Sequence, residues 1–163
     1  MLKKIYTAIF LFLFCTNLQA KNLEQIFEDW HVLTTLQEEQ KICYIVSVPK
    51  EESGNFESRA EAYLLVSKFK DREAEVSISS GFPYKIGGEV EFKINDKSFN
   101  LRKIEDNLAW AESSKLDQDI ITALKAGNSL NAKGTSAEGQ YAIDTYSLMG
   151  FTNAYNKMME LCK

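Results

Sequence analysis

The residues best suited to chemistry in this sequence are carboxylates. Asp106, Glu112 and Asp144 stand nearest to aromatic residues, and two such acids at one cleft could act as general acid and general base. The chain contains 23 Asp and Glu residues, so a solvated surface acid is the simpler interpretation of each. A hydrolase built on scattered carboxylates is therefore an alternative hypothesis and not the leading one.

Other catalytic and metal-binding patterns are absent from the sequence. Histidine occurs once, as His31 between Trp30 and Val32, where a packed or solvated ring is expected. No G-x-S-x-G sequence supplies a nucleophilic serine. EF-hand, H-E-x-x-H and paired-cysteine patterns are also missing, so the sequence predicts no cofactor and no enzymatic activity.

A small-residue segment near the C-terminus offers a candidate interaction loop. Its backbone amides could form a concavity for an anion or for a partner. The residues concerned are Lys133, Gly134, Thr135, Ser136, Glu138 and Gly139. The segment lacks the spacing of a phosphate loop, and a tight connection between two strands is the preferred explanation of its glycines.

The N-terminus predicts export. Lys3 and Lys4 precede an apolar run, residues 5–15, and Leu18-Gln19-Ala20 ends in the small residue that signal peptidases prefer. We expect residues 1–20 to be a secretory signal peptide and residues 21–163 to be one mature domain. The run is about half of the roughly 20 residues that cross a bilayer, so no transmembrane span is predicted. The mature protein would be periplasmic or secreted, with outer-membrane association left open.

Cysteine and charge counts describe the mature chain further. Export leaves only Cys43 and Cys162, and an even count in an oxidising compartment predicts one disulfide between them. Two of the 19 Lys and Arg residues leave with the signal peptide, so the mature charge is 17 − 23 = −6. A protein that binds phosphates needs a basic face, so nucleic acid is not an expected partner.

The periodicity of apolar residues predicts a mostly β protein. Residues 41–48 place Ile42, Tyr44 and Val46 on one face and Cys43 and Ile45 on the other, which predicts a strand buried on both faces. Further strands are expected at residues 30–36, 62–69, 73–79, 89–95, 130–133 and 141–147, with a hairpin through residues 95–97 into Phe99 and Leu101.

Two segments show helical spacing, and two others show no clear pattern. A capping box at Ser114 begins a helix that Gly127 ends, and a second amphipathic helix runs from Thr152 towards Cys162. Residues 23–28 are expected to be helical or irregular, and residues 50–59 a solvated loop. The fold expected from this order of elements is an antiparallel β-sandwich, or a partly closed barrel, with a mid-chain helix and a C-terminal helix.

Several segments resemble the invasion-associated locus B family. The most specific is the block from Asp144 to Ala154, which precedes the terminal cysteine. The others are residues 43–50, 63–66, 75–83, 109–111 and 133–137. The resemblance spans residues 27–162. It implies an immunoglobulin-like β-sandwich in an exported bacterial protein, periplasmic or secreted and associated in some cases with the outer membrane, with no established catalytic residues.

The resemblance also bears on the small-residue segment. In that family an arginine usually stands where this chain has Glu138, so the segment reverses its charge here. The departure weakens an anion-binding role for residues 134–139. The family contributes no functional residues to carry across beyond Cys43 and Cys162 as a bridge.

Three functional hypotheses follow from the sequence. The leading one is a noncatalytic envelope protein that binds an unknown envelope or cell-surface macromolecule through loops at one end of the sandwich. The alternatives are the carboxylate hydrolase and a structural or stress-protective envelope accessory. A cleft with convergent polar groups would favour the hydrolase, and an exposed apolar patch would favour the binding protein.

Overall fold

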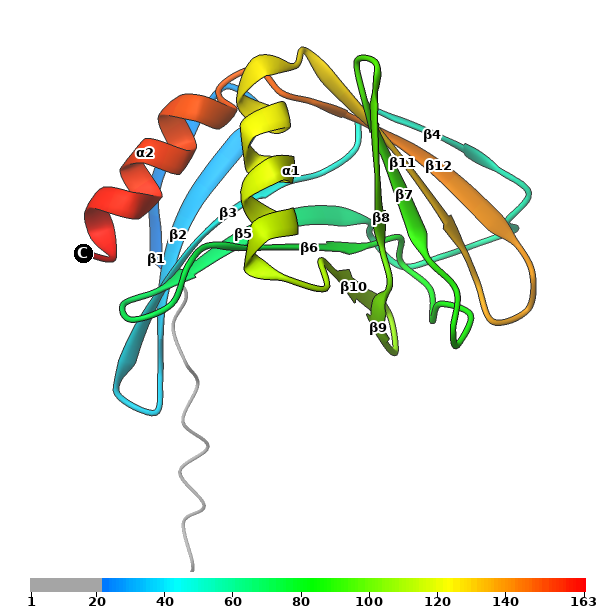
Figure 1. Ribbon diagram of the computed structural model, residues 1–163, viewed down its shortest axis with the longest axis horizontal. Coiled ribbons are helices and arrows are strands. Elements are labelled where there is room, and N and C mark those ends of the chain that lie inside the picture. Colours follow the sequence, from blue (N-terminus) through cyan, green and yellow to red (C-terminus); the bar gives the residue numbers. More distant parts are fainter. Residues whose placement is uncertain (1–21) are drawn as a thin grey trace, which may run out of the picture.

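The protein is a two-sheet β-sandwich with two helices (Figure 1). The computed structural model describes residues 22–163, so the predicted signal peptide lies outside the described residues. Sheet A contains, in spatial order, β1 (Asn22–Phe27), β2 (Trp30–Gln37), β3 (Gln40–Ser47), β5 (Tyr63–Phe69), β6 (Glu75–Ser79), β10 (Leu108–Trp110) and β9 (Lys103–Glu105). Sheet B contains β4 (Glu51–Gly54), β12 (Tyr141–Ser147), β11 (Ser129–Thr135), β7 (Val90–Ile94) and β8 (Lys97–Leu101).

Sheet B and the helices α1 (Ser114–Ala126) and α2 (Phe151–Leu161) cover the same face of sheet A, which we call its inner face (Figure 1). The named strands pair antiparallel throughout, and neither sheet closes into a barrel within the described residues. The predicted antiparallel sandwich with a mid-chain and a C-terminal helix is therefore confirmed.

The core lies between the inner faces of the two sheets and the helices. Trp30 is fully buried there, and its indole N–H donates to the carbonyl of Ser147 at 3.1 Å, which links β2 to the end of β12. The ring of Phe151 meets the Trp30 ring edge-on, with centroids 4.9 Å apart. Trp30 is thus the core anchor that its alternating strand predicts.

Helix α2 closes the inner face of sheet A over β1, β2, β3 and β5. It buries Tyr155 and Met158 as its spacing predicts, and the Cys43–Cys162 disulfide ties its end to β3, with Cα atoms 5.9 Å apart. The predicted disulfide is therefore confirmed. By the chain-entropy model, closing a loop of 119 residues stabilises the fold by roughly 4 to 5 kcal/mol, as an upper figure.

Helix α1 begins one residue earlier than the capping-box prediction places it. Ser113 is the N-cap, and its hydroxyl accepts from the amide of Leu116 at 3.3 Å. Asp117 does not cap the helix. Its carboxylate instead accepts from the amide of Val76 in β6 at 2.8 Å, so this side chain fastens α1 to sheet A.

Residues 23–28 were expected to be helical or irregular, but residues 23–27 lie in edge strand β1 and Glu28 forms the turn into β2. The prediction was wrong because a bulge between Leu23 and Gln25 interrupts the period of two by which strands are recognised. The side chain of Glu24 accepts a hydrogen bond from the hydroxyl of Thr34 on β2 at 2.6 Å. A bulge and a charged residue on an edge strand both discourage pairing with another chain.

Residues 50–59 were also predicted wrongly. Residues 51–54 form edge strand β4, which pairs with β12, and Arg59 is buried. The charged composition hid the strand, since an edge strand needs backbone pairing but no apolar side chains. A further short hairpin, β9 with β10, turns at Asp106, whose φ is 52°.

Candidate functional site

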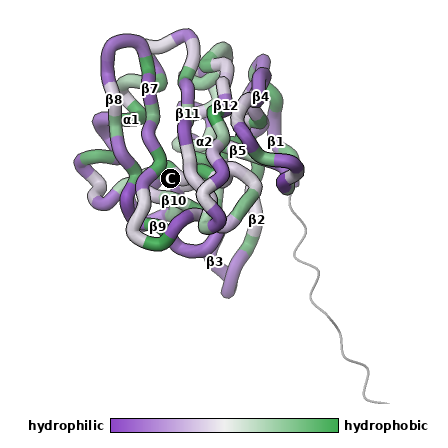
Figure 2. The backbone as a smooth tube through the Cα atoms, turned by 90° about the vertical axis from the view of Figure 1, so that its right-hand side faces the viewer, coloured by the Kyte–Doolittle hydropathy of each residue, from purple (hydrophilic) through white to green (hydrophobic). Residues whose placement is uncertain are grey.

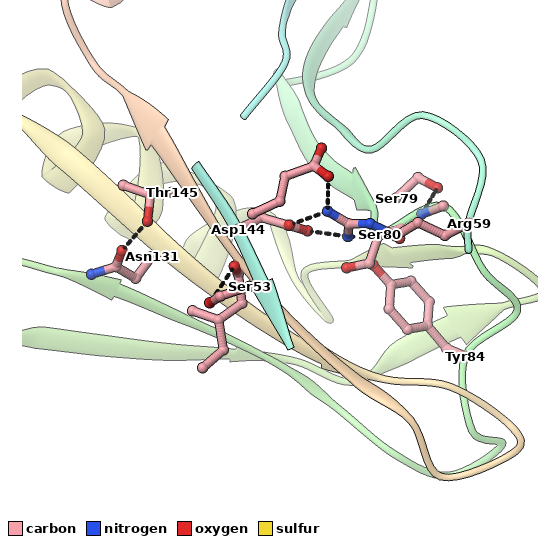
Figure 3. Close-up of polar contacts among 11 residues, drawn as sticks. Ser53, Arg59, Ser79, Ser80, Tyr84, Asn131, Asp144 and Thr145 are labelled. Atoms are coloured by element: carbon pink, nitrogen blue, oxygen red, sulfur yellow. Dashed lines mark hydrogen bonds and ion pairs between the residues drawn. The ribbon is translucent and has the colours of Figure 1, made fainter. Parts of the chain in front are cut away.

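Asp144, a candidate acid, lies in the interior of the sandwich on β12 and has no exposed side-chain surface. The guanidinium of Arg59 donates to both of its carboxylate oxygens, with Nη1 to Oδ2 at 2.8 Å (Figure 3). Only 3% of the Arg59 side chain is exposed. The two residues therefore form a buried, bidentate ion pair.

The Arg59 guanidinium also contacts both neighbouring segments. Nη1 donates to the carbonyl of Ser80 just after β6 at 3.0 Å, and Nη2 pairs with Glu52 on β4 at 3.1 Å. The guanidinium lies 4.4 Å from the centre of the Phe56 ring. Arg59 thus joins strands of sheet B to the end of a strand of sheet A. We call Arg59, Asp144, Glu52 and Ser80 together the Arg59 clasp.

Burial and pairing act against each other in the clasp. Burial opposes the charge of Arg59, but the hydrogen bonds with Asp144 and Glu52 outweigh it, so the pKa of the guanidinium is raised and it stays charged. Burial raises the pKa of the Asp144 carboxyl, and the hydrogen bonds from Arg59 oppose that rise. A carboxylate whose two oxygens are both held by arginine is positioned for structure and not for proton transfer.

Two tyrosines complete the polar interior near the clasp. The Tyr84 hydroxyl lies 2.9 Å from the Ser80 hydroxyl, and burial raises the pKa of Tyr84 and of Tyr146 well above the usual range. The Tyr146 hydroxyl and Arg59 Nε are buried without a hydrogen-bond partner. Such orphaned groups each cost about 1 to 3 kcal/mol, so the clasp joins the sheets at an energetic cost.

The other candidate acids are placed elsewhere. Asp106 forms the turn between β9 and β10, where its carbonyl accepts from the amide of Tyr84 at 2.9 Å. Glu112 is half exposed and lies 3.8 Å from Arg102. His31 is exposed on β2. In residues 22–163 no group of three or more His, Cys, Asp or Glu side chains could hold a metal ion.

The predicted interaction loop is mostly packed backbone. Lys133, Gly134 and Thr135 are the last residues of β11, and Ser136 is buried. A Cβ atom on Gly134 would lie 2.6 Å from the ring of Tyr84, so this glycine is required by close packing. Gly139, with φ of +86°, makes the turn into β12. Lys133 and Glu138 are the charged side chains that this segment leaves exposed.

The outer face of sheet A is the most unusual surface of the molecule. A sheet covered on one side alternates apolar residues inward with polar residues outward. Here β1, β2, β3 and β5 place fourteen residues outward without one Asp, Glu, Lys or Arg among them. Two of these, Gln37 and Gln40, face each other at the β2–β3 hairpin. The other twelve are Leu23, Ile26, His31, Leu33, Thr35, Ile42, Tyr44, Val46, Tyr63, Leu65, Ser67 and Phe69. We call them the apolar face.

The middle of the apolar face is hollowed. A depression of about 450 Å³ lies over β2, β3 and β5, and it contains the small side chain of Ser67 among larger neighbours. Its lining comprises Leu33, Thr35, Ile42, Tyr44, Val46, Tyr63, Leu65, Ser67 and Phe69. On β1, beside this hollow, Leu23 and Ile26 stand 55% and 51% exposed. The Tyr44 hydroxyl is buried without a partner.

The apolar face answers the prediction for β3. That strand was expected to be buried on both faces, and its inner residues Cys43 and Ile45 are fully buried. Its outer residues Tyr44 and Val46 stay partly exposed, because both helices and sheet B lie on the other side (Figure 1). Sequence periodicity therefore identified two apolar faces of β3, of which the described chain covers one.

The fold and these surfaces define a class of protein, an antiparallel β-sandwich with a disulfide-tied terminal helix. The family model for the invasion-associated locus B (IalB) protein matches residues 30–159, so the chain belongs to this family. The chain is also similar to the crystal structure of invasion associated protein B from Bartonella henselae, with a TM-score of 0.59 and 17% identity, covering 86% of this chain and 98% of that one. At this identity the likeness concerns the fold. No curated protein matches the chain.

Proposed function

We propose that this protein is an exported, noncatalytic interaction module of the bacterial envelope, and that it binds its partner through the apolar face of sheet A. The single observation that carries the proposal is the absence of any charged Asp, Glu, Lys or Arg from twelve outward positions on four neighbouring strands. Contiguous exposed apolar surface of this kind marks binding sites, because water solvates it poorly.

The export part of the proposal rests on the N-terminal sequence. Lys3 and Lys4, the apolar run and Leu18-Gln19-Ala20 form a signal-peptide pattern, which leaves residues 21–163 as a single mature domain in the periplasm or outside the cell. The Cys43–Cys162 disulfide supports an oxidising compartment. Within residues 22–163 no helix is long and apolar enough to cross a membrane.

The location of the binding surface differs from the sequence hypothesis, which placed it in loops at one end of the sandwich. The segment 133–139 stays a predicted secondary contact, through the exposed side chains of Lys133 and Glu138. No observation favours the carboxylate hydrolase, since Asp144 is enclosed by Arg59 and Glu112 faces Arg102 at the surface.

Site-specific photo-crosslinking in the native cell tests the proposal. A photoreactive phenylalanine derivative replaces Tyr63 in the hollow, and a control variant carries it at the exposed Ser98 on β8 of sheet B. We expect a defined covalent adduct from position 63 and none from position 98, because the proposed partner contacts neither β8 nor the outer face of sheet B beside it. Equal labelling at the two positions, or no adduct from position 63, would contradict the proposal.

A further inference from the structure

The apolar face has two parts with opposite shapes. The hollow of about 450 Å³ lies over β2, β3 and β5, and the projecting side chains of Leu23 and Ile26 lie on β1 at the edge of the sheet. Building on the proposed function, we infer that the partner on this face is a second copy of the chain, packed face to face about a two-fold axis. The axis runs along the strands, midway between β2 and β3 of each copy.

This axis brings the two shapes together. It lays β1 of one copy over β5 of its partner and β2 over β3, since the strand order is β1-β2-β3-β5. The projecting residues of each copy then enter the hollow of the other. An interface of this isologous kind repeats every contact twice, so one shape match serves both copies.

The strand register identifies which residues meet. Leu23, Leu33, Tyr44 and Ser67 form one row across the four strands. The axis reverses the order of each row and keeps its height along the strands. Leu23 therefore lies over Ser67 of the other copy, where the smallest side chain of the row leaves the most room.

The next row behaves in the same way. It consists of Ile26, His31, Val46 and Leu65. The axis places Ile26 over Leu65 and His31 over Val46 of the other copy. Both rows thus place an apolar side chain of β1 above β5.

The charge and size of the face fit a weakly bound second copy. None of the twelve positions that meet is Asp, Glu, Lys or Arg, whose buried charge would require a partner. The guanidinium of Arg72 stacks on the Phe69 ring, 3.9 Å from its centre, outside the rows of Leu23 and Ile26. With strands about 4.8 Å apart and same-face residues about 6.8 Å apart, twelve outward residues cover roughly 400 Å² of flat sheet. Even with the added relief of the side chains this is small beside the ~800 Å² per partner of a standard interface, so a weak dimer that forms only at high concentration is expected.

The sheet edges explain why the faces associate rather than the strands. The bulge in β1 and the hydrogen bond of Glu24 to Thr34 disfavour an added strand at that edge. A two-fold face contact closes at two copies, because it uses the same surface on both.

Sedimentation velocity of the processed, oxidised chain tests this inference between about 1 μM and about 500 μM. We expect a monomer–dimer equilibrium. Ile26→Lys or Leu65→Glu should weaken the affinity of the dimer at least about tenfold, because each buries an unpaired charge.

The double variant should recover most of the lost affinity, since the two opposite charges meet across the interface. Ile86→Lys, at a residue 94% exposed on the β6–β7 connection, is the matched control and should dimerise like the unmodified chain. Circular dichroism and tryptophan fluorescence verify that each variant is folded. If Leu65→Glu does not fold, Leu65→Thr takes its place as a variant expected to weaken the dimer.

The outcomes separate this inference from the proposed function. A chain that stays monomeric throughout, a dimer that Leu65→Glu leaves unchanged, or a double variant without recovery would overturn the dimer. If the chain is monomeric while position 63 crosslinks to a different envelope molecule, the proposed function stands and the second copy is wrong. If the chain is monomeric and position 63 gives no adduct, both the dimer and the proposed function are wrong.

Discussion

The two sheets differ in where each departs from the ordinary pattern of a sandwich. The outer face of sheet B is polar along β7, β8 and β11, and the tube in Figure 2 alternates between hydrophilic and hydrophobic there. Its outward side chains in these strands are Glu91, Lys93, Ser98, Asn100, Ser129, Asn131 and Lys133. Its inner face, however, contains the charged Asp144. Sheet A is the reverse over β1, β2, β3 and β5, with an apolar outer face and a disulfide on its inner face.

The two departures have different roles: the buried charge of Asp144 is structural, and we propose that the exposed apolar face is functional. A charge inside a sandwich requires a partner within the same chain, and Arg59 supplies it. Apolar side chains on the outside of a sheet need no such partner to fold, and we propose that another molecule covers them. The Arg59 clasp is therefore satisfied within the described chain, whereas the proposed partner of the apolar face lies beyond it.

The largest effect is expected from breaking the buried ion pair of Arg59 and Asp144. Arg59→Met leaves Asp144 buried and unpaired, and it should lower the free energy of unfolding by about 3 to 5 kcal/mol. Adding Asp144→Leu should recover most of that loss, because no buried charge remains. Arg72→Met is the matched control, since the Arg72–Glu75 pair is exposed and contributes about 0 to 1 kcal/mol. Urea unfolding measures all three, and a double variant as unstable as the single one would mean that the pair stabilises the fold by itself.

The second effect concerns sheet A alone. Replacing Cys43 and Cys162 by alanine should lower stability by about 2 to 4 kcal/mol, because α2 loses its covalent tie to β3. Hydrogen exchange should accelerate most in α2 and β3 and least in β11 and β12, which share no residue with the bridge. Uniform acceleration in both sheets would show that the sandwich opens as one unit.

The smallest effect compares two buried carboxylates. Asp117 has a backbone amide where Asp144 has an arginine, and burial raises its pKa although the hydrogen bond from the Val76 amide lowers it. A raised pKa means that the folded state holds the proton more tightly, so this contribution to stability is present at low pH and is lost as pH rises through the folded pKa.

Asp117→Asn removes that titration and keeps an oxygen for the Val76 amide. We expect the variant to be more stable than the unmodified chain by up to about 1 kcal/mol near pH 7, and the advantage to shrink as pH falls towards about 4. Denaturant unfolding at both pH values measures the difference. A variant that is less stable near pH 7 would show that the charged form is the favoured partner of β6.

Most of the sandwich could be predicted from sequence because its central strands alternate. Strand β7 is an example, because Val90, Phe92 and Ile94 face inward with charged residues between them. This alternation alone is enough to predict a strand. The edge strands β1 and β4 could not be predicted, because a bulge and a charged composition remove the periodic signal. Neither segment has a local property that reveals its pairing partner.

The candidate site was harder to predict than the fold. Asp144 was selected for its neighbouring aromatic residues, but its partner Arg59 is 85 positions away in a segment that looked solvated. No local spacing encodes such a pair. The apolar face, in contrast, was already visible in the two apolar faces of residues 41–48, and the sequence could not tell which of them the chain itself would cover.

The bridge between β3 and α2 also bears on the order of folding. When the chain is made from its N-terminus, β1, β2, β3, β5 and β6 are complete by residue 79. Helices α1 and α2 and every strand of sheet B except β4 come later in the sequence. The growing chain therefore presents both surfaces of its largest sheet to its surroundings at once. Contacts over such long separations form slowly. Until α2 docks on sheet A, these five strands are exposed on both faces and prone to aggregate. They are therefore the segment that a chaperone would be expected to bind.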